Sequence, residues 1–209
     1  MWKRGLDLLL SFFSLLALSP LLLAVSVWVK CDSPGPIIFR QQRVGRGGRL
    51  FVIFKFRSMH TPPGAHGSQI TVGNDSRITR AGAFLRRTKV DELPQLWNVL
   101  RGDMSIVGPR PEVPQYVALY PPAVRDIVLS VRPGITDLAS LAFRDESTRL
   151  GQSADPEATY VEQILPIKLR YCTDYVQNQS LWLDIKIIIR TVWVLLGLPD
   201  RGDQPSHSS

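Results

Sequence analysis

The chain has 209 residues, of which 44% are hydrophobic, and it carries 25 Lys and Arg against 18 Asp and Glu. A chain of this length buries a core without a disulfide framework or a structural metal, and its apolar content excludes wholesale disorder. Its two cysteines, Cys31 and Cys172, are far apart, which excludes a zinc ribbon and a cysteine-rich secreted module. The net charge of +7 indicates an anionic partner, and composition leaves nucleic acid, phospholipid and a phosphorylated substrate open.

The N-terminal segment is the first predicted membrane element. From Leu8 to Val29 there is no charged residue, and as one helix this run would cross a hydrocarbon core of about 30 Å. Basic residues lie beyond both of its ends, which favours the cytoplasmic side for both. In its middle, Pro20 cannot donate to the carbonyl of Leu16, so the helix should bend or break there, and the Ser19 hydroxyl could satisfy that carbonyl. These residues alone leave a re-entrant hairpin and a spanning helix equally open.

The segment that follows is basic and contains a predicted strand. Leu50–Arg57 is rich in Phe, Val and Ile, as strands are. A period of two places Ile53, Lys55 and Arg57 on one face, so we expect the two cations to project together. We expect Thr61–Gly73 to be a mobile loop, because this segment contains several Pro and Gly residues and few apolar side chains.

Three helices are predicted further along. Thr79–Arg87 and Pro94–Leu100 form the first two, and Gly102 is well placed to end the second. Asp155, followed by a proline, predicts the N-cap of a helix that runs towards Gln177.

The C-terminal part contains a second apolar stretch, Leu181–Leu198. Lys186 and Arg190 interrupt it four residues apart and therefore share a face, as in a helix that lies in a membrane interface. The same pattern fits a buried amphipathic core helix. Residues 199–209 predict a short disordered tail.

Asp91 and Glu92 are the candidate reactive groups. Acids before a helix that starts near Pro94 can simply cap its free N–H groups. Here, however, cations such as Arg86 lie upstream, and Arg110 lies downstream between two prolines that stiffen its backbone. Such a field favours the anions, so we expect both carboxylates to be ionised at neutral pH. An ionised aspartate can ligate Mg²⁺ or attack phosphorus, and a stiff arginine suits phosphate.

A series of short motifs links these residues along the chain. They are Lys55-Phe56-Arg57-Ser58-Met59, Arg77-Ile78-Thr79-Arg80, Phe84-Leu85-Arg86-Arg87-Thr88, Asp91-Glu92-Leu93-Pro94-Gln95-Leu96-Trp97-Asn98-Val99-Leu100, Arg101-Gly102-Asp103-Met104-Ser105 and Val107-Gly108-Pro109-Arg110-Pro111. Their order and spacing closely resemble the bacterial sugar transferases of the monotopic phosphoglycosyl transferase superfamily. The resemblance runs from the Ser19-Pro20 break to the Asp184–Ile189 helix, and the chain looks like a minimal member without further N-terminal transmembrane helices.

The resemblance implies an α-rich α/β fold in a monotopic membrane protein. Residues 1–30 would form a re-entrant helix–break–helix with its break at Ser19 and Pro20, which favours re-entry over spanning. Residues 31–198 would form a small cytoplasmic catalytic domain with interfacial amphipathic helices around it. The implied location is the bacterial inner membrane, with the catalytic domain on the cytoplasmic face in contact with membrane lipid.

The resemblance also implies a reaction: transfer of phosphosugar from a UDP-sugar donor to polyprenyl (undecaprenyl) phosphate, with release of UMP, at the start of polysaccharide or glycoconjugate synthesis. Asp91 matches the nucleophile that forms a covalent phosphosugar intermediate, and Glu92 matches its acidic partner. Mg²⁺ is the expected cofactor, with Asp91 as a ligand. Arg86 and Arg110 match phosphate- or nucleotide-contacting residues, and Lys55 and Arg57 are assigned to the same basic pocket.

One segment departs from the family pattern. After Pro133-Gly134-Ile135-Thr136, relatives commonly continue with Gly, whereas this chain continues with Asp137-Leu138-Ala139-Ser140. The identity of the sugar therefore does not carry over. Asp145 and Glu146, slightly further on, receive no role and are interpreted as solvated loop acids.

Two other functions compete with this interpretation. A membrane-anchored basic module without enzymatic activity would bind nucleic acid or anionic lipid in a salt-sensitive way. Nucleic-acid binders interleave aromatic residues with cations along a groove, and only Phe54 and Phe56 suggest that here, so we expect no nucleic-acid partner. The other alternative is a membrane-spanning enzyme with its site outside the cytoplasm.

Overall fold

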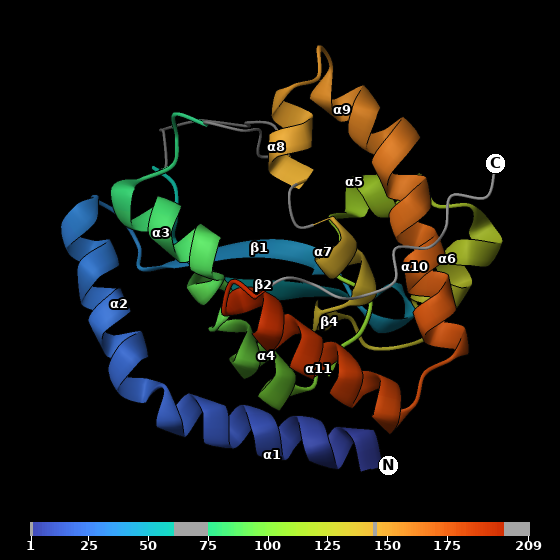
Figure 1. Ribbon diagram of the computed structural model, residues 1–209, viewed down its shortest axis with the longest axis horizontal. Helices are drawn as coiled ribbons and strands as arrows, with labels where there is room; N and C mark the ends of the chain where they lie inside the picture. The colour runs from blue at the N-terminus through green and yellow to red at the C-terminus, as the bar shows by residue number, and fades with distance from the viewer. Residues whose placement is uncertain (1, 61–74, 144–145, 199–209) are drawn as a thin grey trace.

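The computed structural model describes residues 2–60, 75–143 and 146–198 as a mostly helical α/β structure with small sheets (Figure 1). The predicted loop at 61–73, the predicted tail at 199–209 and Asp145 lie outside the described residues. The helices are α1 (Trp2–Ala17), α2 (Ser19–Asp32), α3 (Arg80–Thr88), α4 (Gln95–Arg101), α5 (Pro114–Val117), α6 (Pro122–Val128), α7 (Leu138–Ala142), α8 (Glu146–Gly151), α9 (Pro156–Thr159), α10 (Leu165–Gln177) and α11 (Leu181–Leu195).

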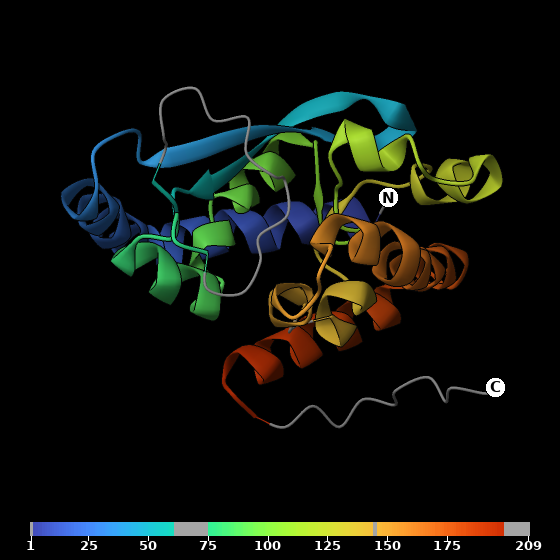
Figure 2. The same cartoon turned by 90° about the horizontal axis from the view of Figure 1, so that it is seen from above.

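The strands form two small sheets. β1 (Ile38–Val44) and β2 (Leu50–Phe56) pair antiparallel, from Ile38 opposite Phe56 to Val44 opposite Leu50. β3 (Ser105–Val107) and β4 (Gly134–Thr136) pair in parallel. The sequence predicted only the second strand of this set. Figure 2 shows the β1–β2 hairpin and α11 on opposite sides of the molecule.

The N-terminal helices break where the sequence predicts. The axes of α1 and α2 differ by 63° at the junction. Pro20 offers no N–H to the carbonyl of Leu16, and the Ser19 hydroxyl donates to that carbonyl at 2.8 Å instead. No helix in the described ranges is by itself long and apolar enough to cross a membrane, whereas α1 and α2 together meet that test as a bent pair.

The start of α1 is attached to the rest of the protein by polar contacts. Lys3 Nζ lies 2.6 Å from the buried Asp184 carboxylate of α11. Asp7, 4% exposed, accepts from Ser105 Oγ at 2.9 Å, and Arg4 donates to the carbonyl of Val99 at the end of α4. Figure 1 shows α1 running below α4 and α11. Together with these contacts, this arrangement places α1 against α4, β3 and the first turn of α11.

Local sequence signals account for several helix boundaries. Thr79 caps α3 by accepting from Gly82 N, and Gly102 ends α4 at a φ of 91°, in the left-handed region that glycine adopts without strain. Asp155 accepts from the N–H of Glu157 at the start of α9, as predicted. Each boundary depends on contacts within a few residues, which is why the sequence predicts it.

The predicted helix from Asp155 to Gln177 is interrupted by a π-helical turn. α9 passes through this turn at Tyr160–Ile164 into α10. Pro166 lacks the N–H that would bond the carbonyl of Glu162, and its ring crowds that carbonyl, so the local widening of the helix has an evident cause.

The largest apolar core lies between α5, α6 and α10. The buried side chains there include Val117, Tyr120, Val128, Leu165 and Leu169. It supports one side of the site described below and consists mostly of residues after position 110.

α11 has two different faces. Asp184, Ile187 and Val194 are buried against the domain, while Trp182 and Ile189 are 66% and 61% exposed. One face of α11 therefore packs on the core, and the other exposes large apolar side chains.

Arg57 contradicts the prediction that it projects with Lys55. β2 ends at Phe56, so strand alternation no longer governs the next residue. The Arg57 side chain is buried against the end of α2, where Nη2 donates to Ser33 O at 2.6 Å and to Val29 O at 3.2 Å. Arg57 therefore attaches α2 to the end of β2 and does not line the pocket described below.

Candidate active site

Asp91 and Glu92 lie in a short turn between α3 and α4. The turn, Val90–Glu92, is a 3-10 helix that follows Lys89, whose φ of 58° redirects the chain. Both acids are buried, with 5% and 7% of their surface exposed. The residue at the N-cap of α4 is Pro94, with no side-chain capping bond, so the interpretation of this pair as simple helix caps does not hold.

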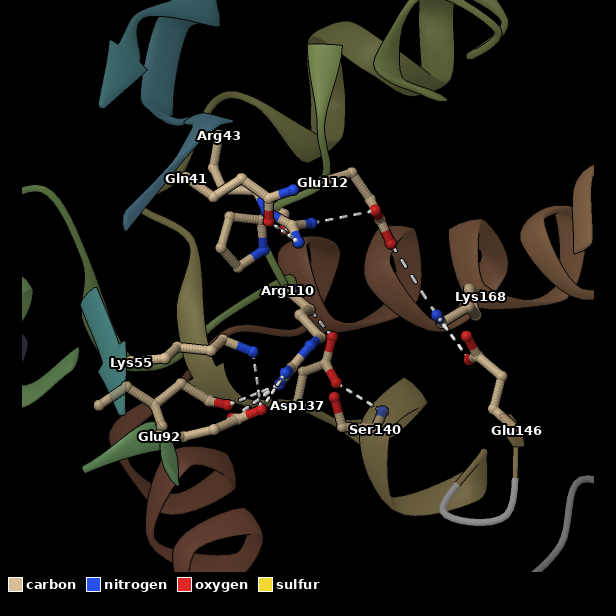
Figure 3. Close-up of polar contacts among 12 residues, drawn as sticks. Gln41, Arg43, Lys55, Glu92, Arg110, Glu112, Asp137, Ser140, Glu146 and Lys168 are labelled. Atoms are coloured by element: carbon tan, nitrogen blue, oxygen red, sulfur yellow. Dashed lines mark hydrogen bonds and ion pairs between the residues drawn. The ribbon is translucent and has the colours of Figure 1, made fainter. Parts of the chain in front are cut away.

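Glu92 is held by two cations from distant parts of the chain. Lys55 Nζ of β2 lies 3.0 Å from Oε1, while Arg110 donates Nη1 to Oε2 at 3.1 Å and Nη2 to Oε1 (Figure 3). Burial of Glu92 favours its neutral form, but Arg110 and Lys55 outweigh it and hold the pKa of Glu92 well below its usual value. Glu92 is therefore the fixed anion of the pair.

Asp91 has the opposite environment. Burial raises its pKa above the usual value, the adjacent charge of Glu92 adds to that rise, and Lys55 and Lys89 oppose it. The expectation that the surroundings favour the anion is thus correct for Glu92 and wrong in direction for Asp91. Asp91 Oδ1 is buried and has no hydrogen-bond partner among the described residues. An unpartnered carboxylate oxygen with a raised pKa is a stronger base and nucleophile than an ordinary aspartate.

A pocket of about 410 Å³ opens at this pair. Arg86, Lys55 and Arg110 line it, so the structure brings together three of the four cations assigned from the sequence, and Arg57 lies elsewhere. Their contacts with a substrate stay a prediction. Lys89 also lines the pocket, which further raises the positive charge around Asp91.

Asp137 positions Arg110. Its Oδ2 accepts from the backbone N–H of Arg110 at 2.9 Å, and its Oδ1 accepts from Ser140 N at 2.6 Å, which caps α7. The stiff Gly108-Pro109-Arg110-Pro111 segment is also packed closely against β4, because a Cβ at Gly134 would lie 2.1 Å from Gly108 N. The sequence gives no sign of this role for Asp137 beyond its place directly after Pro133-Gly134-Ile135-Thr136, where the chain departs from the family pattern.

A second group of charges lines the far part of the pocket. Glu112 accepts from Tyr160 Oη at 2.6 Å. It also lies 3.5 Å from Arg43, and Lys168 lies 2.7 Å from Glu146 (Figure 3). Glu146 is therefore ion-paired, and its interpretation as a solvated loop acid is wrong. The partners come from β1, α8 and α10, so no local signal in the sequence could have grouped them.

The residues fit a metal site only in part. In the described part of the chain no group of three or more His, Cys, Asp or Glu side chains could hold a metal ion. Both oxygens of Glu92 are taken by Arg110 and Lys55, which leaves Asp91 as the available ligand. Mg²⁺ is commonly bound by one or two carboxylates together with substrate phosphates and water, so a single carboxylate is compatible with a metal that arrives with a diphosphate.

Comparison with known proteins bears on the whole chain. A model of the family described as bacterial sugar transferase matches residues 1–197. An Aeromonas hydrophila protein, UDP-N-acetylgalactosamine-undecaprenyl-phosphate N-acetylgalactosaminephosphotransferase, is 40% identical over 93% of this chain. A Xanthomonas campestris pv. campestris protein, UDP-glucose:undecaprenyl-phosphate glucose-1-phosphate transferase, is 44% identical over 91% of it.

The relatives differ in length. The alignments cover 43% of the Aeromonas protein and 38% of the Xanthomonas protein, so the chain spans about two fifths of their length. The exopolysaccharide production protein PSS of Rhizobium leguminosarum bv. phaseoli is 41% identical over 91% of this chain, and there 92% of the relative is covered.

Proposed function

Since the chain belongs to the bacterial sugar transferase family, we propose that it transfers a phosphosugar from a UDP-sugar to undecaprenyl phosphate and releases UMP. The names of the Aeromonas and Xanthomonas relatives describe reactions of this type, with different sugars. No observation favours the alternative of a basic module without enzymatic activity.

The observation that carries the proposal is the pair of unequal carboxylates. Glu92 has both oxygens engaged by cations, whereas the neighbouring Asp91 keeps one oxygen without a partner and lines a pocket together with Arg86, Lys55 and Arg110. A nucleophile among cations is the arrangement that phosphoryl transfer needs, because the reacting phosphate is anionic and charge develops on the leaving group.

In the first half-reaction, Asp91 attacks the β-phosphorus of the UDP-sugar. A bond forms between a carboxylate oxygen and phosphorus, the bond from phosphorus to the bridging oxygen breaks, and UMP leaves with that oxygen and its electron pair. In the second half-reaction, a phosphate oxygen of undecaprenyl phosphate attacks the same phosphorus and releases Asp91. The product is a sugar joined to the lipid through a diphosphate, and the enzyme is regenerated.

The cations carry the electrostatic part of both steps. Arg110 is held by Glu92 and by Asp137, so it stabilises charge on the transferring phosphate without reorganisation. Glu92 orients Arg110 and Lys55 and in this way assists the acceptor phosphate. If Mg²⁺ binds, Asp91 and the substrate diphosphate would hold it, and the ion would neutralise charge on the phosphates.

We also propose that α1 and α2 form a re-entrant membrane hairpin and that the catalytic part lies at the cytoplasmic face of the bacterial inner membrane. Away from its contacts with the domain, the hairpin exposes large apolar side chains: Leu9 60%, Phe13 60%, Leu16 63%, Leu23 68% and Val27 57%. Burying such a surface in lipid is favourable by about 25 cal/mol per Å² of apolar area. A lipid acceptor requires the site to stay near the membrane.

The reaction is tested by incubating the detergent-solubilised protein with Mg²⁺ and a panel of UDP-sugars. UMP should appear with at least one donor and the lipid acceptor, and intact-mass spectrometry without acceptor should show an adduct equal to the phosphosugar. Asp91→Asn should abolish both signals. Asp126→Asn is the matched control, because that carboxylate is 77% exposed. Product without any adduct would contradict the covalent route.

The hairpin is tested with thiol labelling from either side of sealed membrane vesicles. Cys31 is exposed at the end of α2 and reports one flank, and Trp2→Cys, in a background with Cys31→Ser, reports the other. Cys172 should stay silent, because burial raises the pKa of its thiol well above the usual value. Re-entry predicts that both reporters react from the cytoplasmic side. Labelling from opposite sides would require a spanning helix.

A further inference from the structure

Two residues in the pocket wall carry a buried polar atom without a partner. Within the described residues, the side-chain atoms that are buried and unpartnered belong to Ser11, Arg57, Asp91, Gln95 and Ser140. Of these residues, only Asp91 and Ser140 line the pocket. Buried polar groups are nearly always satisfied, so an unpartnered polar atom in a pocket wall indicates a partner supplied by water or by a ligand. Asp91 has such a role in the proposed function, and Ser140 has none so far.

Ser140 is fixed in place close to the reacting pair. Its backbone N–H donates to Asp137 Oδ1 at 2.6 Å, and Asp137 Oδ2 accepts from the backbone of Arg110 at 2.9 Å. Arg110 in turn holds Glu92. Figure 3 shows this sequence of contacts from Glu92 to Ser140. The α7 wall is thus held to the same arginine that holds Glu92, while the direction of the Ser140 hydroxyl depends on χ1 alone.

Charge is unevenly distributed over the pocket lining. Arg86, Lys89, Lys55 and Arg110 attract phosphates, and Arg43, Glu112, Glu146 and Lys168 form the second charged group. Between them the lining on and beside α7 has no charged side chain: Ile135, Thr136, Ser140, Leu141 and Phe143. Phosphates lose affinity on such a neutral wall, but sugar hydroxyls are recognised by neutral polar groups.

The connectivity of the donor decides which neutral part lies there. The sugar is bonded through one oxygen to the phosphorus that Asp91 attacks, whereas the uridine is separated from it by a second phosphate. The neutral wall next to the dyad is therefore reached by the sugar before the uridine. The wall is also the segment in which the chain departs from its family pattern, at Asp137-Leu138-Ala139-Ser140.

From the orphan hydroxyl and its placement we propose that Ser140 reads a hydroxyl or acetamido group of the donor sugar, and that the α7 wall determines which UDP-sugar is used. This inference rests on the proposed function. The Ser140 hydroxyl can both donate and accept a hydrogen bond. Gain or loss of such a bond distinguishes sugars that differ at a single position.

The test compares donors that differ at one carbon: UDP-glucose with UDP-galactose and UDP-N-acetylglucosamine with UDP-N-acetylgalactosamine at C4, and UDP-glucose with UDP-N-acetylglucosamine at C2. For each pair, the ratio of kcat/KM values in UMP release is measured for the wild type, Ser140→Ala and Ser140→Cys. Ser130→Ala is the matched control, since that exposed hydroxyl only donates to Ile127 O at 2.7 Å. We expect both Ser140 variants to change the ratio by about tenfold for at least one pair that contains the best donor, and the control to leave every ratio unchanged.

A binding measurement separates sugar from uridine recognition. In the Asp91→Asn background, Ser140→Ala should weaken the binding of the preferred UDP-sugar by about tenfold. The affinity for UDP should stay unchanged, because UDP lacks the transferred sugar. An equal loss for UDP and the UDP-sugar would overturn the inference in favour of a uridine contact or a structural role, as would unchanged donor ratios in both Ser140 variants. Failure of the wild type to release UMP from any donor would overturn the proposed function, and the inference with it.

Discussion

The ion pair between Arg110 and Glu92 should be a principal stabilising contact of the site. Arg110→Ala removes two donors from a carboxylate whose side chain is only 9% exposed, and leaves it Lys55 alone. Breaking a buried pair by removing one partner costs about 3–5 kcal/mol. Because Arg110 is 29% exposed and Lys55 stays, the lower end applies, about 3 kcal/mol.

A double-mutant cycle measures this energy. Urea unfolding in mild detergent, followed by tryptophan fluorescence, is compared for the wild type, Arg110→Ala, Glu92→Gln and the double variant, and the coupling should be about 2–3 kcal/mol. The surface pair Arg101–Asp103 is the matched control. Its atoms lie 3.5 Å apart with side chains 54% and 26% exposed, so its coupling should stay below about 1 kcal/mol.

The pH dependence of stability tests the direction in which the pKa of Glu92 is shifted. The folded-state pKa of Glu92 lies well below its usual value of 4.5, so its stabilising contribution is present above that value and is lost as pH falls through the folded pKa. Arg110→Ala reduces the depression, so the stability deficit should be largest at neutral pH and should narrow below about pH 4. A coupling under about 0.5 kcal/mol, or a deficit that is the same at pH 7 and pH 3, would refute the assignment.

Three further outcomes are expected. Burial and the charge of Glu92 raise the pKa of Asp91, so the rate of adduct formation should fall on acidification at a pH above about 3.9, the value for an ordinary aspartate. Glu92→Gln should move this acid limb of the pH profile to lower pH. An unmoved limb would contradict the electrostatic coupling of Asp91 with Glu92. Ser19→Ala should destabilise the protein by about 1 kcal/mol, since the Leu16 carbonyl loses its donor, and an unchanged melting temperature in lipid would argue against that bond. Arg57→Ala should lower the melting temperature by about 6–12 °C while adduct formation per folded molecule persists; loss of the adduct in a stable variant would place Arg57 in the pocket after all.

The features that the sequence predicts correctly depend on near neighbours. Ser19 and Pro20 break the N-terminal helix through contacts within one turn. Thr79, Gly102 and Asp155 mark helix ends because a cap or a left-handed residue acts on backbone groups two to three residues away. The acidic pair and its cations were likewise grouped by proximity in the chain and by the order of the family motifs.

Tertiary structure alone decided the individual roles within the group. Lys55 and Arg57 are two residues apart, yet one reaches Glu92 and the other is buried under α2, because β2 ends between them. Asp91 and Glu92 are adjacent, yet their pKa values shift in opposite directions, since Glu92 alone is reached by Arg110.

The sequence therefore determined several helix ends, the acidic pair with most of the cations around it, and the family to which the chain belongs. Contacts between residues far apart in the chain, such as Arg110 with Glu92 or Lys168 with Glu146, decide the rest. They decide which oxygen is left without a partner, which arginine is structural and which wall faces the substrate. Such pairs are fixed only when the elements pack, because burial and distance, which set the electrostatic energies, have no counterpart in local sequence.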